Sequence, residues 1–277
     1  MFIDTHCHLY DEKFEDIDEI VKNAIKNGVK KMLVAGCDID SCNKAIDLAE
    51  KYEEIYACVG IYPEFAENYD KNTEKTLKNM LKNSKVVAVG EIGLDYTYEN
   101  VSREKQKEVL LKQLKLAKEF EKPVVLHGRD CYGELVSILK ENKNLLDFKG
   151  TFHCFTGSRE LAKEIIKLGF FISAGGVSTF ENAKNVREMI KSVDLDYLIL
   201  ETDSPYLSPK PFRGKRNEPA NIIYIARSLA ELKGVELKEV EEKTTKNAKG
   251  LFRIWFHIIL RKNLDKILYL TKTCLLQ

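Results

Sequence analysis

Histidine and tryptophan are scarce in this chain of 277 residues, which contains five histidines and one tryptophan. Net charge is also nearly absent, because 44 lysines and arginines balance 43 aspartates and glutamates. A positive field over the whole protein is therefore excluded, and any binding of nucleic acid requires a local basic patch. No apolar run reaches the roughly 18–20 residues needed to cross a bilayer, so no membrane span is expected.

Paired cysteine motifs are missing as well. The seven cysteines are Cys7, Cys37, Cys42, Cys58, Cys131, Cys154 and Cys274. They are scattered, odd in number and form no CxxC pair, which favours reduced thiols over a disulfide framework or a zinc finger. No signal peptide precedes the first apolar run at residue 2, so the expected location is the cytoplasm.

Apolar, β-branched runs alternate with charged helical stretches along most of the chain. Strands are predicted at 1–6, 31–36, 55–60, 86–93, 123–128, 150–155, 170–176 and 197–203. Helices are predicted near 16–27, 40–51, 73–82, 103–120, 131–142, 159–168, 181–191 and 218–233. Eight βα units predict an α/β fold, a (β/α)8 TIM barrel over residues 1–252, since such barrels typically take about 250 residues. A doubly wound open sheet is the alternative, but no GxGxxG turn follows the first strand.

Two of the five histidines stand in the first strand, which reads FIDTHCHLY over residues 2–10. Side chains alternate along a strand, so His6 and His8 point the same way, about 6–7 Å apart, and Cys7 points the other way. Two such imidazoles can converge on one metal ion. An ordinary strand with two partly exposed histidines is the alternative.

The remaining strands decide between these alternatives. Catalytic groups of a TIM barrel project from the C-terminal ends of its strands. The polar residues predicted at those ends are His6, His8, Glu91, His127, Arg129, His153, Glu201 and Asp203. Four of the five histidines fall there, which disfavours unrelated buried histidines. Imidazole and carboxylate ligands fit two divalent ions, and Glu91 lies between the histidine pairs in strand order, where it can bridge both.

Six segments then resemble a known family, the TatD-type metal-dependent deoxyribonucleases of the metallo-hydrolase barrel superfamily. They are DTHCHL, VGEIGLDY, VVLHGRD, TFHCFTGS, ETDSPYL and RGKRNEP, in that order, and the resemblance runs from residue 1 to about 252. It implies that His6 and His8 bind one metal, that His127 and His153 bind the other, and that Glu91 bridges them. Asp203 would complete the first site and position the attacking water.

The resemblance also implies the reaction, which is hydrolysis of phosphodiester bonds in DNA by a two-metal-activated water, as a 3′-5′ exodeoxyribonuclease. Two divalent ions per chain are expected, Mg²⁺ or Mn²⁺ for activity and Zn²⁺ as a further candidate for the bound ion. The expected partner is single-stranded DNA or 3′ ends, and a monomer is favoured. Glu91 and Asp203 are the expected catalytic residues, with Asp203 accepting a proton. Glu201 is expected to support a histidine or water, or else is an inert buried acid.

Phosphate contacts are expected from cations near the site. Arg129 can form paired hydrogen bonds to a phosphate, or else a salt bridge at the barrel rim. The basic loop 209–219 contributes Arg213, Lys215 and Arg216, with Lys210 beside them, to DNA backbone contacts, unless it is a solvated charge run. Ser158 in FTGSRE marks a helix start that either receives a phosphate or is simply capped.

Two departures from the family pattern stand out. Tyr62 occupies the position after the third strand where the family usually has a histidine, which alters a possible phosphate contact. The segment 253–277 extends past the resemblance as an atypical tail with helical spacing of apolar residues. A packed helix is favoured there over an exposed amphipathic helix or an unselected extension.

Rival functions are an amidohydrolase, disfavoured by the absence of a lysine in VGEIGLDY, and a non-catalytic barrel with a structural metal.

Overall fold

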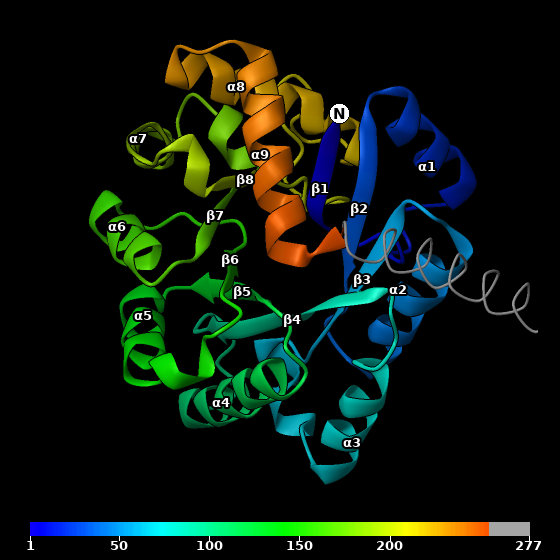
Figure 1. Cartoon of the computed structure of the whole chain (residues 1–277), viewed down its shortest axis with the longest axis vertical. Coiled ribbons are helices and arrows are strands. Elements are labelled where there is room, and N and C mark those ends of the chain that lie inside the picture. The colour runs from blue at the N-terminus through cyan, green and yellow to red at the C-terminus, as the bar shows by residue number, and fades with distance from the viewer. Residues whose placement is uncertain (255–277) are drawn as a thin grey trace, which may run out of the picture.

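The structure, a computed structural model, describes residues 1–254 (Figure 1). Its eight strands are β1 (Phe2–Cys7), β2 (Val29–Ala35), β3 (Ile55–Val59), β4 (Val86–Asp95), β5 (Val124–Arg129), β6 (Gly150–Phe152), β7 (Phe171–Ala174) and β8 (Leu198–Leu200). All are parallel and paired in chain order. An isolated parallel bridge between Cys7, the last residue of β1, and Ser204, four residues after β8, links the end of the ring back to its first strand. The prediction of a (β/α)8 barrel is therefore confirmed.

Helices surround this ring of strands (Figure 1). They are α1 (Ile17–Lys26), α2 (Ile39–Lys51), α3 (Lys71–Met80), α4 (Arg103–Glu119), α5 (Tyr132–Glu141), α6 (Arg159–Lys167), α7 (Lys184–Ser192), α8 (Ile222–Lys233) and α9 (Leu237–Phe252). The first eight lie where the sequence predicts helices. Five of them begin at a side chain that accepts a first-turn N–H, namely Asp16, Asp38, Asp70, Ser102 and Ser158. Such caps satisfy amides that have no partner within the helix, and they fix where each helix starts.

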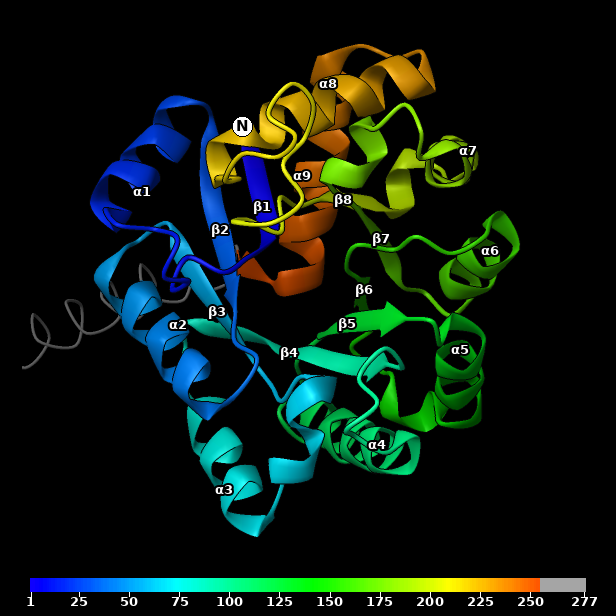
Figure 2. The same ribbon diagram turned by 180° about the vertical axis from the view of Figure 1, so that it is seen from behind.

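The helix α9 was not predicted, although it closes one mouth of the barrel (Figure 1). Ala248, Leu251 and Phe252 pack in one buried cluster with residues from several strands. Those strand residues include Ile3, Leu33, Ala35, Tyr56, Cys58, Val87, Ala88, Val125 and Ile199. This end is therefore filled with apolar side chains, and polar chemistry is left to the opposite mouth. The loop after β8, drawn in yellow, lies in front of the ring when the molecule is seen from behind (Figure 2).

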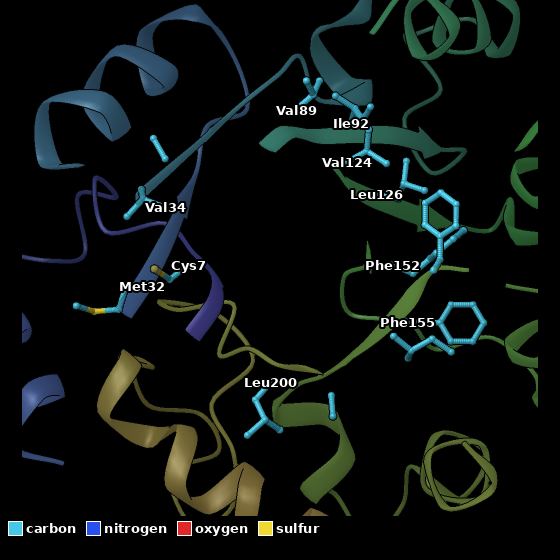
Figure 3. Packing of buried hydrophobic residues seen from close by; sticks show 14 of the residues in the cluster. Cys7, Met32, Val34, Val89, Ile92, Val124, Leu126, Phe152, Phe155 and Leu200 are labelled. Atoms are coloured by element: carbon cyan, nitrogen blue, oxygen red, sulfur yellow. The ribbon is translucent and has the colours of Figure 1, made fainter. Parts of the chain in front are cut away.

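A second apolar layer lies between the strands and the outer helices (Figure 3). Met32 and Val34 belong to this layer, whereas Leu33 between them points into the barrel, as strand alternation requires. The alternation shifts in β1, where Ile3 packs inside and Cys7 packs outside although both are odd-numbered. An irregularity in the β1–β2 pairing between Asp4 and Cys7 accounts for this shift. It leaves the neighbours of Cys7 facing the barrel mouth.

Strands β6 and β8 each end three residues earlier than predicted, just before polar residues. Strand β6 ends at Phe152, so His153 follows it, and β8 ends at Leu200, before Glu201 and Asp203. The backbone turns left-handed nearby, at Cys154 (φ 43°) and Asp203 (φ 55°). That conformation is uncommon for residues other than glycine and cannot continue a strand. The polar side chains are thereby carried on the loops at the C-terminal mouth.

Among residues 1–254, no helix combines the length and hydropathy of a membrane span. The described part of the final segment shows Arg253 in a left-handed conformation (φ 53°) directly after α9, followed by the buried Ile254. The helix predicted over 253–277 falls almost entirely outside the described residues. The boundary predicted at residue 252, between the barrel and the C-terminal tail, stays a prediction.

Candidate metal centre

Four side chains from β1, β4 and the residues just after β1 and β8 form a first group at the C-terminal mouth. The Nε2 atoms of His6 and His8 lie 3.2 Å apart. They lie 3.7 Å and 3.4 Å, respectively, from Asp203 Oδ1. Glu91 Oε2 is 3.3 Å from His6 Nε2 and 3.9 Å from His8 Nε2. This group therefore offers two imidazole nitrogens and two carboxylate oxygens around one point.

A second group shares only Glu91 with the first. Its Oε1 atom lies 3.0 Å from His127 Nδ1 and 3.0 Å from His153 Nε2. These two nitrogens are 3.3 Å from each other. The two oxygens of Glu91 thus face different groups, and the groups adjoin, because the His6 and His153 rings stack with centroids 3.9 Å apart. The six predicted ligand residues come together in one cluster.

The donor set of this cluster fits divalent cations. Imidazole nitrogen with carboxylate oxygen is a ligand set for zinc, manganese or iron, and with added water also for magnesium. His6, His8, Glu91, His153 and Asp203 are all buried. Ring nitrogens held about 3 Å apart in a dry site repel one another unless a proton or a metal ion lies between them. Residues of this kind in this arrangement would hold up to two ions.

The pKa values of the ligands reflect the same crowding. Burial works against ionisation of Glu91, yet the charges of His153 and His6 and the hydrogen bond from His127 hold its pKa well below the usual range. Burial lowers the pKa of His6, with a further decrease from His153. Burial also acts against protonation of His8, but hydrogen bonding to Asp203 raises its pKa well above the ordinary value. Protons and metal ions therefore compete for these nitrogens, and metal affinity falls as pH decreases.

Hydrogen bonds on the far side of two rings fix which nitrogen faces the cluster. His8 Nδ1 lies 3.0 Å from the Ala35 carbonyl oxygen, which turns Nε2 toward the other ligands. His127 is turned the other way, because its Nε2 lies 3.0 Å from Asp95 Oδ2. Hydrogen bonds from His127 and Thr97 outweigh burial and hold the pKa of Asp95 at about 2, so it is a carboxylate that accepts the imidazole proton. The free electron pair of His127 is then on Nδ1, toward Glu91.

Asp95 was not among the predicted site residues, although it lies in the VGEIGLDY segment four residues after Glu91. Its role follows from the contact between β4 and β5, where Asp95 pairs in register with Arg129. Gly93 allows this close approach, since a Cβ atom there would lie 1.9 Å from the His127 carbonyl oxygen. Tyr62 joins the same pair, with its hydroxyl 3.0 Å from both Asp95 Oδ2 and His127 Nε2. Tyr62 therefore contacts both His127, a predicted ligand, and the carboxylate that orients it.

Replacing Asp95 by asparagine should weaken metal binding by about 10- to 100-fold, mainly at the His127 group. The neutral amide no longer holds the His127 proton on Nε2, so Nδ1 is less available. Titration with Mn²⁺ by calorimetry measures the affinity, and thermal unfolding shows whether the fold persists. Asp40→Asn, at an exposed position on α2, is the matched control. Unchanged Mn²⁺ affinity in a folded Asp95→Asn protein would refute this role.

Glu201 lies beneath the second group, as an acid fully buried beside His153. Its Oε1 accepts a hydrogen bond from the Cys154 amide at 2.6 Å and lies 3.6 Å from His153 Nδ1. Glu201 Oε2, His6 Nδ1 and His153 Nδ1 are buried without a hydrogen-bond partner among the described residues. The structure thus places Glu201 next to His153, one of the predicted ligands.

A pocket of about 270 Å³ opens above the cluster. Its walls carry five aromatic side chains, Tyr10, Tyr62, Phe65, Tyr98 and Tyr206. Asp11 and Glu64 are also in its lining, but no lysine or arginine of the described residues is. Cations for substrate contacts must therefore come from outside this pocket.

The four predicted cations lie around the pocket rather than in it. Arg129 is exposed in a neighbouring cavity of about 610 Å³, which also contains Arg103, Tyr132 and Thr156. It makes no ion pair or side-chain hydrogen bond with any described residue. In the basic loop, the Arg213 guanidinium lies 4.5 Å from the Phe180 ring centroid. Arg216 donates to the Lys13 carbonyl oxygen at 2.9 Å, and Lys215 is exposed.

Ser158 caps α6, accepting a hydrogen bond from the Leu161 amide at 3.3 Å. The capping alternative is therefore what the structure shows for its side chain. Whether the backbone amides beside it receive a phosphate stays a prediction.

Comparisons with known proteins agree with this site. A sequence model of the family described as "TatD related DNase" matches residues 3–253. The chain belongs to the TatD family of metal-dependent hydrolases. It is 42% identical over 255 residues to the uncharacterized metal-dependent hydrolase YabD of Bacillus subtilis (strain 168), covering 92% of this chain and 100% of that one. The uncharacterized metal-dependent hydrolase YcfH of Escherichia coli (strain K12) is 36% identical over 256 residues, covering 91% and 96%.

Solved structures show the same TatD fold. The crystal structure of YjjV, a TatD homologue from Escherichia coli K12, superposes with a TM-score of 0.87 at 34% identity, covering 91% of this chain and 98% of that chain. An uncharacterized amidohydrolase from Saccharomyces cerevisiae superposes at 0.78, with 23% identity and coverage of 91% and 99%. At that identity the likeness concerns the fold alone.

Proposed function

We propose that this TatD protein hydrolyses phosphodiester bonds in DNA with two divalent ions held at the cluster. The observation that carries the proposal is Glu91, whose two oxygens each face a different histidine group. A carboxylate in that position suits two ions about 3.5–4 Å apart, as in many phosphodiesterases. Mg²⁺ or Mn²⁺ are the proposed activating ions, with Zn²⁺ as a further candidate.

The ions would supply charge neutralisation at the phosphate and would lower the pKa of water. The chain's own residues hold them and handle the proton. Asp203 lies at the open side of the cluster, since it lines the pocket together with His8 and Glu91. Burial opposes its ionisation, but the hydrogen bond from His8 and the charges of His153 and His6 keep its pKa low, so it is a carboxylate that can accept the proton of the attacking water.

The aromatic lining of the pocket favours a single strand over a duplex as substrate. Aromatic walls such as Tyr98 and Tyr206 offer faces for unpaired bases or sugars, and stacking of this kind is independent of sequence. Arg129 on one side and the basic loop on the other supply cations for phosphates beyond the scissile one. Attack from the 3′ end as a 3′-5′ exodeoxyribonuclease is part of the proposal. A cytoplasmic location and a monomeric state stay predictions.

One observation favours a second candidate, hydrolysis of a small ester or lactone. The pocket carries no lysine or arginine of the described residues, and its volume of about 270 Å³ suits a small molecule. The family model favours the nuclease, as does the absence of a lysine at the position of Glu91, where many amidohydrolases bridge their metals with a carboxylated lysine.

Turnover of single-stranded DNA and of small esters, each with Mn²⁺ and with a chelator, separates the two candidates. The nuclease proposal predicts release of nucleotides from 3′-labelled DNA, abolished by the chelator. Turnover of esters together with intact DNA would favour the second candidate instead.

Neutralising the basic loop tests the path proposed for DNA. The triple variant with Arg213→Ala, Lys215→Ala and Arg216→Ala should bind single-stranded DNA more weakly. Each phosphate contact that is lost should lower the log–log salt slope of binding by about 0.7. Hydrolysis of a minimal phosphodiester should change much less, because these side chains do not line the pocket. A variant of the exposed Lys75, Lys143 and Lys163, with the same change of charge, is the control. An equal effect of both triple variants would show that the loop makes no specific contact.

A further inference from the structure

A thiol lies at the edge of the first ligand group. Cys37 follows β2, is half-buried and lines the pocket. Its Sγ lies 3.9 Å from Glu91 Oε2 and 3.6 Å from the Tyr10 hydroxyl. The ligand atoms of His8, Cys37 and Glu91 all lie within 4.8 Å of one another. Ligands that sit about 2.0–2.3 Å from one Zn²⁺ lie at most about 4.5 Å apart. The 3.9 Å between Cys37 Sγ and Glu91 Oε2 is within that limit, so this sulfur is near enough to share an ion with Glu91.

The thiol adds to the first group and does not define a third site. Cys37 Sγ lies near Oε2 of Glu91, the oxygen that also faces His6 Nε2 at 3.3 Å and His8 Nε2 at 3.9 Å. The other oxygen of Glu91, Oε1, faces the second group. An ion held by Cys37 together with Glu91 Oε2 is therefore the ion of the first group.

We propose that Cys37 is a ligand of the ion held by His6, His8 and Asp203 whenever that ion is thiophilic, such as Zn²⁺ or Co²⁺. Thiolate sulfur selects such metals, whereas Mg²⁺ and Mn²⁺ prefer oxygen ligands. On binding, the thiol releases its proton to solvent. The inference rests on the metal centre of the proposed function. It goes beyond that function because Zn²⁺ or Co²⁺ would be bound with the Cys37 sulfur, whereas Mg²⁺ or Mn²⁺ would be bound at the same position without it.

A second thiol near the cluster provides the matched comparison. Cys154 Sγ lies 3.9 Å from Asp203 Oδ2, the same separation as between Cys37 and Glu91. Among residues 1–254, however, Cys154 belongs to no group of three close ligand atoms. Both thiols therefore lie near one carboxylate. Of the two, Cys37 alone also belongs to a group of three close ligand atoms.

Absorption spectra of the full chain loaded with Co²⁺ test the proposal. A cobalt–thiolate bond gives an intense near-ultraviolet charge-transfer band, separate from the weak visible bands of bound Co²⁺. The wild type and Cys154→Ser should both show the charge-transfer band, and Cys37→Ser should lose it while keeping the visible bands. Zn²⁺ affinity should fall about 10-fold or more in Cys37→Ser, with Mn²⁺ affinity within about twofold of the wild type.

Several results would overturn the inference. A wild-type protein that shows the visible bands without the charge-transfer band has no sulfur ligand. A band that survives in Cys37→Ser but disappears in Cys154→Ser assigns the sulfur to the other thiol. Equal losses of Zn²⁺ and Mn²⁺ affinity in Cys37→Ser would show a structural effect. Failure of the wild type to bind Co²⁺ would reject the metal centre itself, and this inference with it.

Discussion

Glu91→Gln should bind both ions about 100-fold or more weakly and should lose DNA hydrolysis by about 10³-fold or more. Each oxygen of Glu91 faces one histidine group, so a neutral amide weakens both groups at once. Two ions supply several kcal/mol of stabilisation of the transition state, and each 1.4 kcal/mol corresponds to about tenfold in rate. Metal content by mass spectrometry and turnover of single-stranded DNA are the measurements.

A comparison of Glu91→Gln with His127→Ala distinguishes a residue that binds both ions from one that binds a single ion. His127→Ala should mainly affect the second group. Among residues 1–254, the polar contacts of the His127 ring are with Glu91, His153 and the Asp95–Tyr62 pair. Glu188→Gln, at an exposed position on α7, controls for loss of a carboxylate. Two ions still bound to Glu91→Gln with wild-type affinity would show that Glu91 is not the bridge, even if turnover fell.

Asp203→Asn should lower kcat by about 10²- to 10⁴-fold at saturating Mn²⁺, which is the range for loss of a general base. The amide keeps an oxygen toward His6 and His8, so the first group should still hold its ion at saturating Mn²⁺. The His127 group does not include Asp203 and should retain its ion as well. The reason is the position of Asp203 on the pocket side of the first group, with a pKa held low by His8 despite burial. Single-turnover kinetics on 3′-labelled DNA measure the chemical step.

Asp47→Asn, an exposed aspartate on α2, provides the matched control for the loss of charge. A kcat within tenfold of the wild type, with both ions bound, would remove Asp203 from proton transfer. Loss of both ions would instead make its role that of a ligand on which the whole cluster depends.

Much of the fold was predictable, because βα alternation is a local property of the sequence. The helix that closes one end of the barrel was harder to predict. The apolar spacing of Val240, Ala248 and Leu251 in α9 is a helical signal. The many charged residues between them, however, make the sequence of α9 resemble that of a helix exposed on the surface. Only the three-dimensional structure shows that its last turn closes the barrel against residues such as Ile3 and Tyr56.

The grouping of the predicted ligand residues could be foreseen for a related reason. Parallel strands bring their C-terminal ends to one mouth, so His6, Glu91 and His153 must meet whatever the details of packing. Sequence does not reveal which imidazole nitrogen faces the cluster, because that depends on partners from other strands. Asp95 reaches His127 across β4 and β5, and Cys37 reaches Glu91 from the loop after β2. Both contacts are therefore visible only in the structure.

Substrate-contacting residues were the least predictable. Arg129 lies two residues after His127, yet it lines a neighbouring cavity, because the strand ends there and the left-handed Asp130 (φ 54°) follows it. Its contact with phosphate, like those of Arg213, Lys215 and Arg216, stays a prediction. A long charged side chain at the rim of a site can be solvated, can pack on a nearby aromatic ring or can contact a ligand. The spacing of such residues along the chain does not distinguish these outcomes.

The most direct test of the two-ion account is a titration of DNA hydrolysis against bound metal. Chelator-treated protein, supplied with increasing Mn²⁺, is assayed on 3′-labelled single-stranded DNA while the bound metal is measured in the same samples. The arrangement of Glu91 between two histidine groups predicts that activity rises to a plateau as the second ion per chain binds. Full activity with one bound ion, or two bound ions with no cleavage of DNA, would contradict it.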